Sequence, residues 1–277
     1  MTIWIHGPSA WDSVVEIGSF PKPGDFLRAV KKSERPGGSG LNVALAIASA
    51  DTEAGFITYL GNDEYGLRLE EVISQSGLKV VHVKRSTKPT LHALILKDES
   101  GERTIIALET TEMAELGLGE AKIESGDIFV FTIWFPEYKQ ILDKLRNIGV
   151  TSIVGTKALE DSDVFADHVV GSQKDFKALN LDEIIKRFGK VVITEGSNGV
   201  TLINGSSKIH QASLADVVRD STGAGDSFLA GYALAVSKHM KDEECLYLAS
   251  VWAAASLATD SSIPPKWESI KDRLGSN

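Results

Sequence analysis

The chain has 277 residues, of which 43% are hydrophobic and 24% are charged, a composition typical of a globular protein rather than a disordered or fibrous one. Its formal net charge of −9 and the absence of a long Lys/Arg block argue against nucleic acid as a partner. A single cysteine, Cys245, excludes an internal disulfide and fits a reducing compartment. The sequence shows neither a signal peptide nor an apolar run of membrane-spanning length, so we expect a cytoplasmic protein that binds no membrane.

The first half of the chain combines regular elements with two β-rich segments. A buried strand is predicted at residues 2–6, and a helix begins at the Gly-Gly-Ser-Gly run of residues 37–40. A strand at 56–60, a helix at 67–75 and a strand at 80–83 follow. The β-rich segments are residues 14–33, with short β-prone runs at 14–17 and 26–30, and residues 91–108, a hairpin around a turn at 98–101. We predict that these two segments pair into a small sheet of their own.

The second half alternates strands with helices. Strands are predicted at 128–133, 152–154, 168–170, 191–194, 200–203 and 208–210, and helices at 138–147, 181–187, 224–238, 243–259 and 266–274. Such alternation predicts an α/β fold, a mainly parallel sheet with helices on both faces. We therefore expect one α/β domain over residues 1–277, with a small β lid formed by the insertions at about 14–33 and 91–108. Ligands in this architecture bind beyond the carboxyl ends of the strands.

The most informative stretch is Asp-Ser-Thr-Gly-Ala-Gly-Asp-Ser-Phe at residues 220–228. Gly223, Ala224 and Gly225 precede a long apolar helix, whose first N–H groups have no intrahelical partner and attract anions. Asp226 then lies beside the bound anion, where a carboxylate can take a proton from an attacking hydroxyl. Taken alone, the stretch also fits an ordinary helix start with an acidic cap.

Together with the rest of the chain, this stretch resembles the ribokinase-like, or PfkB, carbohydrate kinases. A second signature, Gly-Gly-Ser-Gly-Leu-Asn-Val-Ala at residues 37–44, continues at Gly-Asn-Asp of 61–63 and at Gly66. The run Thr-Glu-Gly-Ser-Asn-Gly at 194–199 resembles the nucleotide loop of the family, and Asp12 resembles its N-terminal sugar contact. The resemblance implies a Rossmann-like sheet with a β lid, and transfer of the γ-phosphoryl group of ATP to a hydroxyl of a sugar or sugar-like alcohol.

The resemblance also implies roles for individual residues in transfer and in sugar binding. Asp226 is implied as the base, and the N–H groups of Gly223, Ala224 and Gly225 as the anion hole for the phosphoryl charge. The sugar contacts are implied to be Asp12, Gly38 and Asn42, because a carboxylate accepts from adjacent hydroxyls and an amide both donates and accepts.

Two further residues, Glu137 and Trp134, stand at a strand end and are candidates to line the sugar pocket. The alternatives for them are a helix-start acid and a core aromatic. Arg103, in the predicted hairpin, fits a surface residue better than a phosphate contact.

The nucleotide site is implied to include Thr194, Gly196 and Gly199, where missing side chains let ATP approach. The family usually has an Asn-x-x-Glu motif linked to Mg²⁺, and this chain has Ser172 and Asp175 in its place. Asp175 keeps a carboxylate and is the candidate metal residue, acting through water. The family turn that contributes to a monovalent-cation site in some members is replaced by Asp-Ser-Ser-Ile-Pro at 260–264, so a K⁺ requirement does not carry over.

The expected function is an ATP- and Mg²⁺-dependent kinase of a ketohexose, ribose or fructosamine, and the lid is a candidate surface for pairing with a second copy. One alternative is a nucleoside kinase of the same family, which needs an aromatic slot that Trp11, Phe20 or Trp134 would supply. The other is a sugar- or nucleotide-binding regulator without catalysis, since a fold does not determine function.

Overall fold

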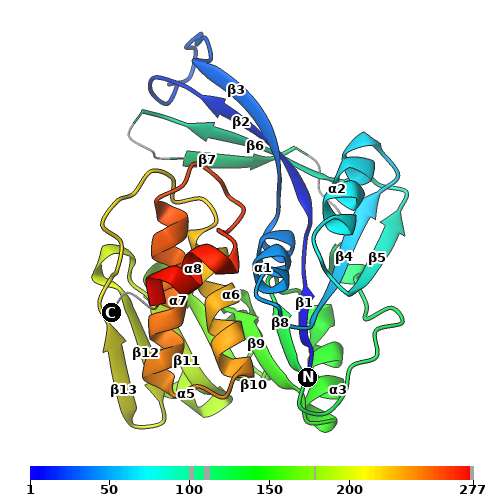
Figure 1. The fold of residues 1–277 in the computed structure, drawn as a ribbon, viewed down its shortest axis with the longest axis vertical. Helices are drawn as coiled ribbons and strands as arrows, with labels where there is room; N and C mark the ends of the chain where they lie inside the picture. The colour runs from blue at the N-terminus through cyan, green and yellow to red at the C-terminus, as the bar shows by residue number, and fades with distance from the viewer. Residues whose placement is uncertain (100–102, 109–112, 178, 275–277) are drawn as a thin grey trace.

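The computed structural model describes residues 1–99, 103–108, 113–177 and 179–274, which form two β-sheets and the helices around them (Figure 1). The larger sheet has nine strands in the order β13-β12-β11-β10-β9-β8-β1-β4-β5. All neighbours from β5 to β11 are parallel, and β12 and β13 add an antiparallel edge. The strands are β1 Ile3–His6, β4 Ala54–Gly61, β5 Val80–Ser86, β8 Ile128–Phe131, β9 Thr151–Gly155, β10 Ala166–Ser172, β11 Phe188–Thr194, β12 Val200–Asn204 and β13 Ser207–Gln211.

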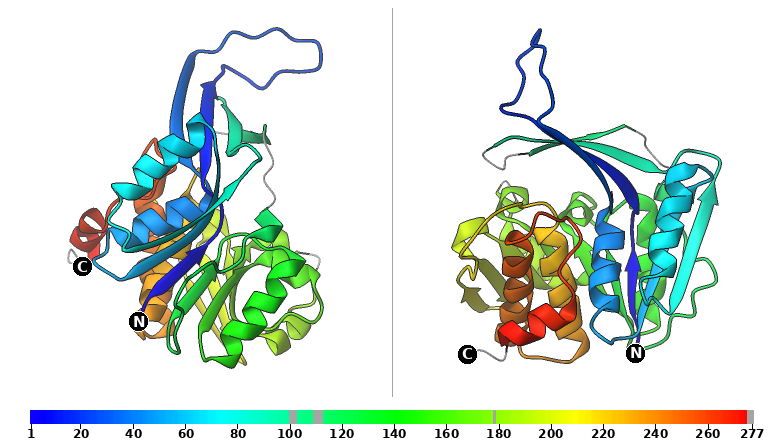
Figure 2. Two further views of the ribbon diagram at one scale, coloured as in Figure 1. Left: turned by 90° about the vertical axis from the view of Figure 1, so that its right-hand side faces the viewer. Right: turned by 45° about the horizontal axis from the view of Figure 1, so that its top comes forward.

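Helices cover both faces of the large sheet, as the alternating pattern predicts (Figure 2). One face carries α1 Ser39–Ala48, α2 Glu64–Ser74, α6 Ala224–Ser237, α7 Asp242–Leu257 and α8 Trp267–Leu274, and the other carries α3 Lys139–Asn147, α4 Gln173–Phe176 and α5 Leu181–Arg187. Successive strand residues point to opposite faces. Ile3 and Ile5 therefore join the apolar cluster on the α6 side, while Trp4 joins the cluster on the α3 side.

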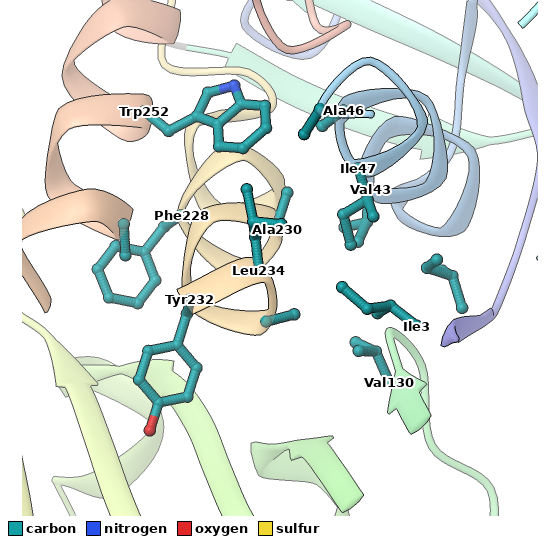
Figure 3. Packing of buried hydrophobic residues seen from close by; sticks show 14 of the residues in the cluster. Ile3, Val43, Ala46, Ile47, Val130, Phe228, Ala230, Tyr232, Leu234 and Trp252 are labelled. Carbon is teal, nitrogen blue, oxygen red and sulfur yellow. The ribbon is translucent and has the colours of Figure 1, made fainter. Parts of the chain in front are cut away.

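Helix α6 lies at the centre of the first cluster (Figure 3). Its residues Ala230 and Leu234 lie between Trp252 of α7 and the residues Val43 and Ile47 of α1. Gly231 lets the backbones of α6 and α7 approach closely, because a Cβ at this position would lie 2.9 Å from Cα of Ala249. This packing holds the N-terminal end of α6, and with it Asp226, in a defined place.

The smaller sheet, which we call the lid sheet, has the strand order β3-β2-β6-β7. Its strands are β2 Ala10–Glu16, β3 Lys31–Gly37, β6 Leu91–Lys97 and β7 Arg103–Ala107. Strand β1 continues almost directly into β2, and β3 ends where α1 begins, so the lid sheet rises from the edge of the body (Figure 1). A cleft of about 480 Å³ lies between it and the loops of residues 218–220 and 260.

The prediction that the two β-rich segments form a separate sheet is confirmed. The strand expected at 26–30 is wrong: these residues lie in the β2–β3 connection, and Phe26 is 87% exposed. The polar run Lys31–Gly37 pairs with Ala10–Glu16 of β2 instead, because the strand beside β2 is the one that leads directly into the start of α1. As an edge strand, β3 tolerates charged residues.

The β6–β7 hairpin is confirmed, although residues 100 and 101 of its expected turn lie outside the described residues. The other predicted strands and helices are present, with ends displaced by a few residues. In the part of the chain that the structure describes, no helix is long and apolar enough to cross a membrane.

We predict that Gly231→Ala lowers the melting temperature. Alanine gains about 1 kcal/mol of helix propensity, but forcing a methyl group against the backbone of α7 costs about 1–3 kcal/mol because backbone atoms cannot rotate away. Gly225→Ala, on the same helix, is the matched control, since nothing lies within 4 Å of its added Cβ. Thermal unfolding followed by circular dichroism checks both, and a Gly231→Ala protein at least as stable as the control would contradict the close packing.

Candidate active site

The first turn of α6 lies beside α1 at the end of the body that faces the lid sheet. The side-chain amide Nδ2 of Asn42, on α1, donates a hydrogen bond of 2.7 Å to Oδ2 of Asp226, in the first turn of α6. Asn42 is buried, and its carbonyl oxygen Oδ1 has no hydrogen-bond partner in the described structure. The pairing orients the carboxylate of Asp226 and leaves a buried acceptor beside it.

The turn before α6 presents backbone donors. Gly223 adopts the left-handed conformation with φ of 80°, and a Cβ there would lie 2.1 Å from the carbonyl oxygen of Ser262, so glycine is required. No side chain caps the helix, and the N–H of Ala224 is 3.5 Å from the oxygen of Ser221, a weak contact. Gly225 is exposed with open space before it. We call Gly223, Ala224 and Gly225 the anion turn, because an uncapped helix start of this kind suits an anion.

Asp12 is a buried carboxylate on the lid sheet, 6% exposed. Gly37, across the β2–β3 pair, leaves room for it, because a Cβ at Gly37 would lie 2.2 Å from Oδ2 of Asp12. Burial raises the pKa of Asp12 to about 6, although the charge of Arg35 acts in the opposite direction. Within the described residues, nothing donates a hydrogen bond to this carboxylate. A carboxylate this little exposed can accept hydrogen bonds from a ligand that brings donors.

Asp226 is electrostatically coupled to this group. Burial raises the pKa of Asp226 to about 6, and the charge of Asp12 raises it further, while the hydrogen bond from Asn42 and the charge of Arg103 lower it. At neutral pH the carboxylate is therefore mainly ionised, yet it is a stronger base than an exposed aspartate. This combination suits proton transfer from a hydroxyl.

Other predicted substrate contacts lie differently. Gly38 has φ of 93° and stands against the β1–β2 connection, where a Cβ would lie 2.6 Å from the oxygen of Pro8. Glu137 is exposed on the short helix η2 Pro136–Tyr138, and among the described residues it has no hydrogen bond or ion pair with Asp12, Asn42 or Asp226. Trp134 is a core aromatic, since it is buried and its indole donates to Asp161.

The predicted nucleotide residues lie at the end of β11. Thr194 ends this strand and donates to the carbonyl oxygen of Gly171 at 3.2 Å, while Gly196 and Gly199 bound the loop to β12 with positive φ. Ser172 pairs in register with Thr194 across β10 and β11. Asp175 forms a capping box with Ser172, whose N–H and hydroxyl both donate to Oδ2, so the cap does not use the other carboxylate oxygen.

Three cationic side chains of the lid sheet, which the sequence did not predict at the site, contact the segment just before the anion turn. Arg103 of β7 donates to the hydroxyl of Ser221, so the expectation that it only decorates the hairpin was wrong. Arg35 and Lys97 lie 3.9 Å and 3.5 Å from Oδ2 of Asp220. Successive side chains of a strand point to opposite faces of the sheet, so the strand register shows which cations share a face with Asp12. Arg35 lies opposite Asp12, and Lys97 lies opposite both Glu16 and Arg103.

Comparison with known proteins identifies the family and the fold of the chain. The pfkB family of carbohydrate kinases matches residues 15–269. Ribokinase of Haemophilus influenzae is 25% identical over 98% of this chain and 97% of its own, and fructoselysine 6-kinase of Escherichia coli is 26% identical over 80% and 89%. The crystal structure of ribokinase from Thermotoga maritima superposes with a TM-score of 0.82 at 25% identity, covering 99% of both chains.

A ribokinase fold with an aspartate beside an uncapped helix start defines the class as a phosphotransferase that acts on hydroxyl groups. The chain belongs to the pfkB family of carbohydrate kinases, whose members use ATP as the phosphate donor.

The pH dependence of turnover tests the charges around Asp226. A base must be ionised, so we expect kcat to rise with pH through an apparent pKa near 6. Asn42→Ala removes a hydrogen bond that stabilises the ionised form and should move this limb upward by about one pH unit. Asp12→Asn removes a repelling charge and should move it downward. Initial rates between pH 5 and 8 check this, and shifts of the opposite sign would contradict the assignment.

Proposed function

We propose that this chain is an ATP- and Mg²⁺-dependent kinase that phosphorylates a hydroxyl of a monosaccharide or close derivative, of the ketohexose, ribose or fructosamine type. The observation that carries the proposal is the buried, unpartnered Oδ1 of Asn42 beside an oriented Asp226, together with the Asp12 carboxylate, a residue only 6% exposed. A polyol brings several O–H donors and satisfies both acceptors at once.

In this mechanism the acceptor lies between the lid sheet and the body. Asp12 and Asn42 accept hydrogen bonds from its hydroxyls, and the backbone at Gly38 and the exposed Glu137 complete the contacts. Holding the reacting hydroxyl beside Asp226 replaces a bimolecular encounter with a positioned one. Asp226 then takes the proton as the hydroxyl oxygen attacks the γ-phosphorus of ATP, whose bond to the β,γ-bridging oxygen breaks to release ADP.

The anion turn stabilises the charge that spreads over the phosphoryl oxygens. Removing one preorganised donor of this kind typically costs about 3 kcal/mol of transition-state stabilisation. The N–H groups of Gly223, Ala224 and Gly225 are supplied by the start of α6, a helix that is packed into the core from Phe228 onward. Thr194, Gly196 and Gly199 line the nucleotide site in the proposal, with exposed loop backbone that ATP can approach.

A magnesium ion fits the residues near this nucleotide loop. Mg²⁺ keeps several waters and is usually bound through one or two carboxylates and the substrate phosphates rather than by an all-protein cage. Asp175 offers one carboxylate oxygen beyond its cap, next to the strand that ends at Thr194. Asp175 would hold the ion through water, and the bound ion supplies neutralisation of the phosphate charge.

The positions of Trp11 and Trp134, two of the three aromatic candidates for a nucleoside slot, favour a sugar over a nucleoside; the third, Phe20, is half-buried in the β2–β3 connection. A nucleoside kinase needs an aromatic slot near the acceptor site. Trp11 lies on the lid face opposite Asp12, where it stacks on Tyr65 and under Arg68, and Trp134 is in the core. A regulator without catalysis would not need a carboxylate oriented beside an open helix start.

We also propose that residues 1–277 act as one unit in the cytoplasm, with the lid sheet covering the acceptor. The outer face of the lid sheet, opposite Asp12, exposes Ile106 and Leu108 at 42% and 48%. A second copy that pairs there would bury both side chains. A monomeric mass in analytical ultracentrifugation would exclude this dimer.

A panel of sugars, fructosamines and nucleosides with ADP detection tests the function. We expect turnover with a monosaccharide or derivative in the presence of Mg²⁺, and loss of turnover when EDTA removes the metal. Turnover with nucleosides alone, or tight sugar binding without any ADP formation, would contradict the proposal.

On the acceptor that is turned over, Asp226→Asn should lower kcat by at least about 10³-fold, while calorimetric affinities for ATP and sugar change little, because only proton transfer is lost. Asp175→Asn is the comparison variant, and its loss should depend on the Mg²⁺ concentration. An Asp226→Asn enzyme within tenfold of wild type would remove Asp226 from the role of base.

A further inference from the structure

Three cations from three lid strands contact one short segment just before the anion turn. Lys97 of β6 donates to the carbonyl oxygen of Arg219 at 3.3 Å and lies 3.5 Å from the Asp220 carboxylate. Arg35 of β3 lies 3.9 Å from the same carboxylate and donates to the oxygen of Asp260 at 3.2 Å. Arg103 of β7 donates to Ser221. The lid sheet therefore meets the body at residues 219–221, which only Thr222 separates from Gly223.

Asp220 connects the two sides of this contact. Its side chain is 4% exposed. One oxygen, Oδ2, faces Lys97 and Arg35, while the other, Oδ1, accepts the backbone N–H of Thr222 at 2.8 Å. A single carboxylate thus touches the lid sheet and also orders the backbone that leads into the anion turn.

The lid cations make the burial of Asp220 tolerable. Burial alone raises the pKa of Asp220, but the hydrogen bonds from Thr222 and the charges of Lys97 and Arg35 together lower it. The side chains of Lys97 and Arg35 are only 17% and 16% exposed, so solvent screens these pairs weakly. If the lid sheet moves away, Oδ2 of Asp220 loses both cations and must be hydrated or find other partners. Loss of these contacts then favours rearrangement of the backbone that Asp220 orders through Thr222.

Arg35 retains unused binding capacity in this conformation. Its Nε and Nη2 are buried without hydrogen-bond partners, and its pair with Asp220 is long at 3.9 Å. A guanidinium binds a carboxylate best through two parallel hydrogen bonds. A small approach of the lid sheet toward the body therefore strengthens its contact with Asp220.

We propose that Asp220 is a positioning residue that couples the lid sheet to the anion turn, so that the turn keeps its working shape only while Lys97 and Arg35 contact Asp220. The inference rests on the proposed function, since it takes Gly223, Ala224 and Gly225 as the site of phosphoryl charge. The lid sheet then affects kcat through the shape of the anion turn. Asp220 itself does not contact the transferred phosphoryl group.

Steady-state kinetics of lid variants tests the coupling. Lys97→Met keeps the length of the side chain and removes its charge, and we expect kcat to fall by about tenfold to a hundredfold, as for the loss of one charge-assisted hydrogen bond, with KM values changed less than about threefold. Lys97→Arg should restore most of kcat. Lys31→Met is the matched control, because Lys31 is on the same lid face but is exposed and pairs with Glu16.

A double-mutant cycle separates coupling from independent damage. Asp220→Asn combined with Lys97→Met should lower kcat little more than Asp220→Asn alone, because both remove one shared contact. Losses that multiply, or a Lys97→Met enzyme whose kcat equals that of Lys31→Met, would overturn the proposal.

Hydrogen exchange of the free protein gives a readout that needs no turnover. Asp220→Asn should speed amide exchange both in residues 219–226 and in strand β6, while Lys31→Met leaves residues 219–226 unchanged. Unchanged exchange in β6 overturns the coupling even if the protein is an active sugar kinase. Faster exchange in both segments, with no turnover on any acceptor, supports the coupling and places the failure in the proposed function.

Discussion

The hydrogen bond between Asn42 and Asp226 is the contact on which the candidate site depends. It joins the start of α1 to the start of α6, although the two residues are 184 positions apart in the chain. Both helices are buried along their length against the same apolar cluster, so their ends cannot separate without breaking the core. The amide donates a single hydrogen bond, which orients the carboxylate and leaves it free to accept another.

Three aspartates at this end of the molecule show how partners, rather than residue type, determine acidity. Asp12 and Asp226 have raised pKa values because burial outweighs the cations near them. Asp220 is also buried, but hydrogen bonds and two close lid cations lower its pKa. The first two are suited to hydroxyl groups and protons, and the third to holding structural elements together.

Much of the architecture follows from local sequence patterns. The alternation of apolar strands and amphipathic helices predicts the parallel sheet and its two layers, because hydrophobic periodicity is a property of neighbouring residues. The anion turn is predicted for the same reason, since Gly223 and Gly225 directly precede an apolar helix. The exception is the lid sheet, where the β-prone residues 26–30 remain outside the strands and the polar Lys31–Gly37 pairs with β2.

The sequence by itself therefore determined the layers of the fold, the helix start that can bind an anion, and the family signatures that point to sugar phosphorylation. Only the tertiary structure decided that Asn42 orients Asp226, that Trp134 belongs to the core, and that Arg35, Lys97 and Arg103 from the lid sheet contact residues 220 and 221. These contacts depend on strand register and on helix packing between distant segments. The number of residues between two positions does not indicate their distance in space, which is set only when the hydrophobic core packs distant segments together.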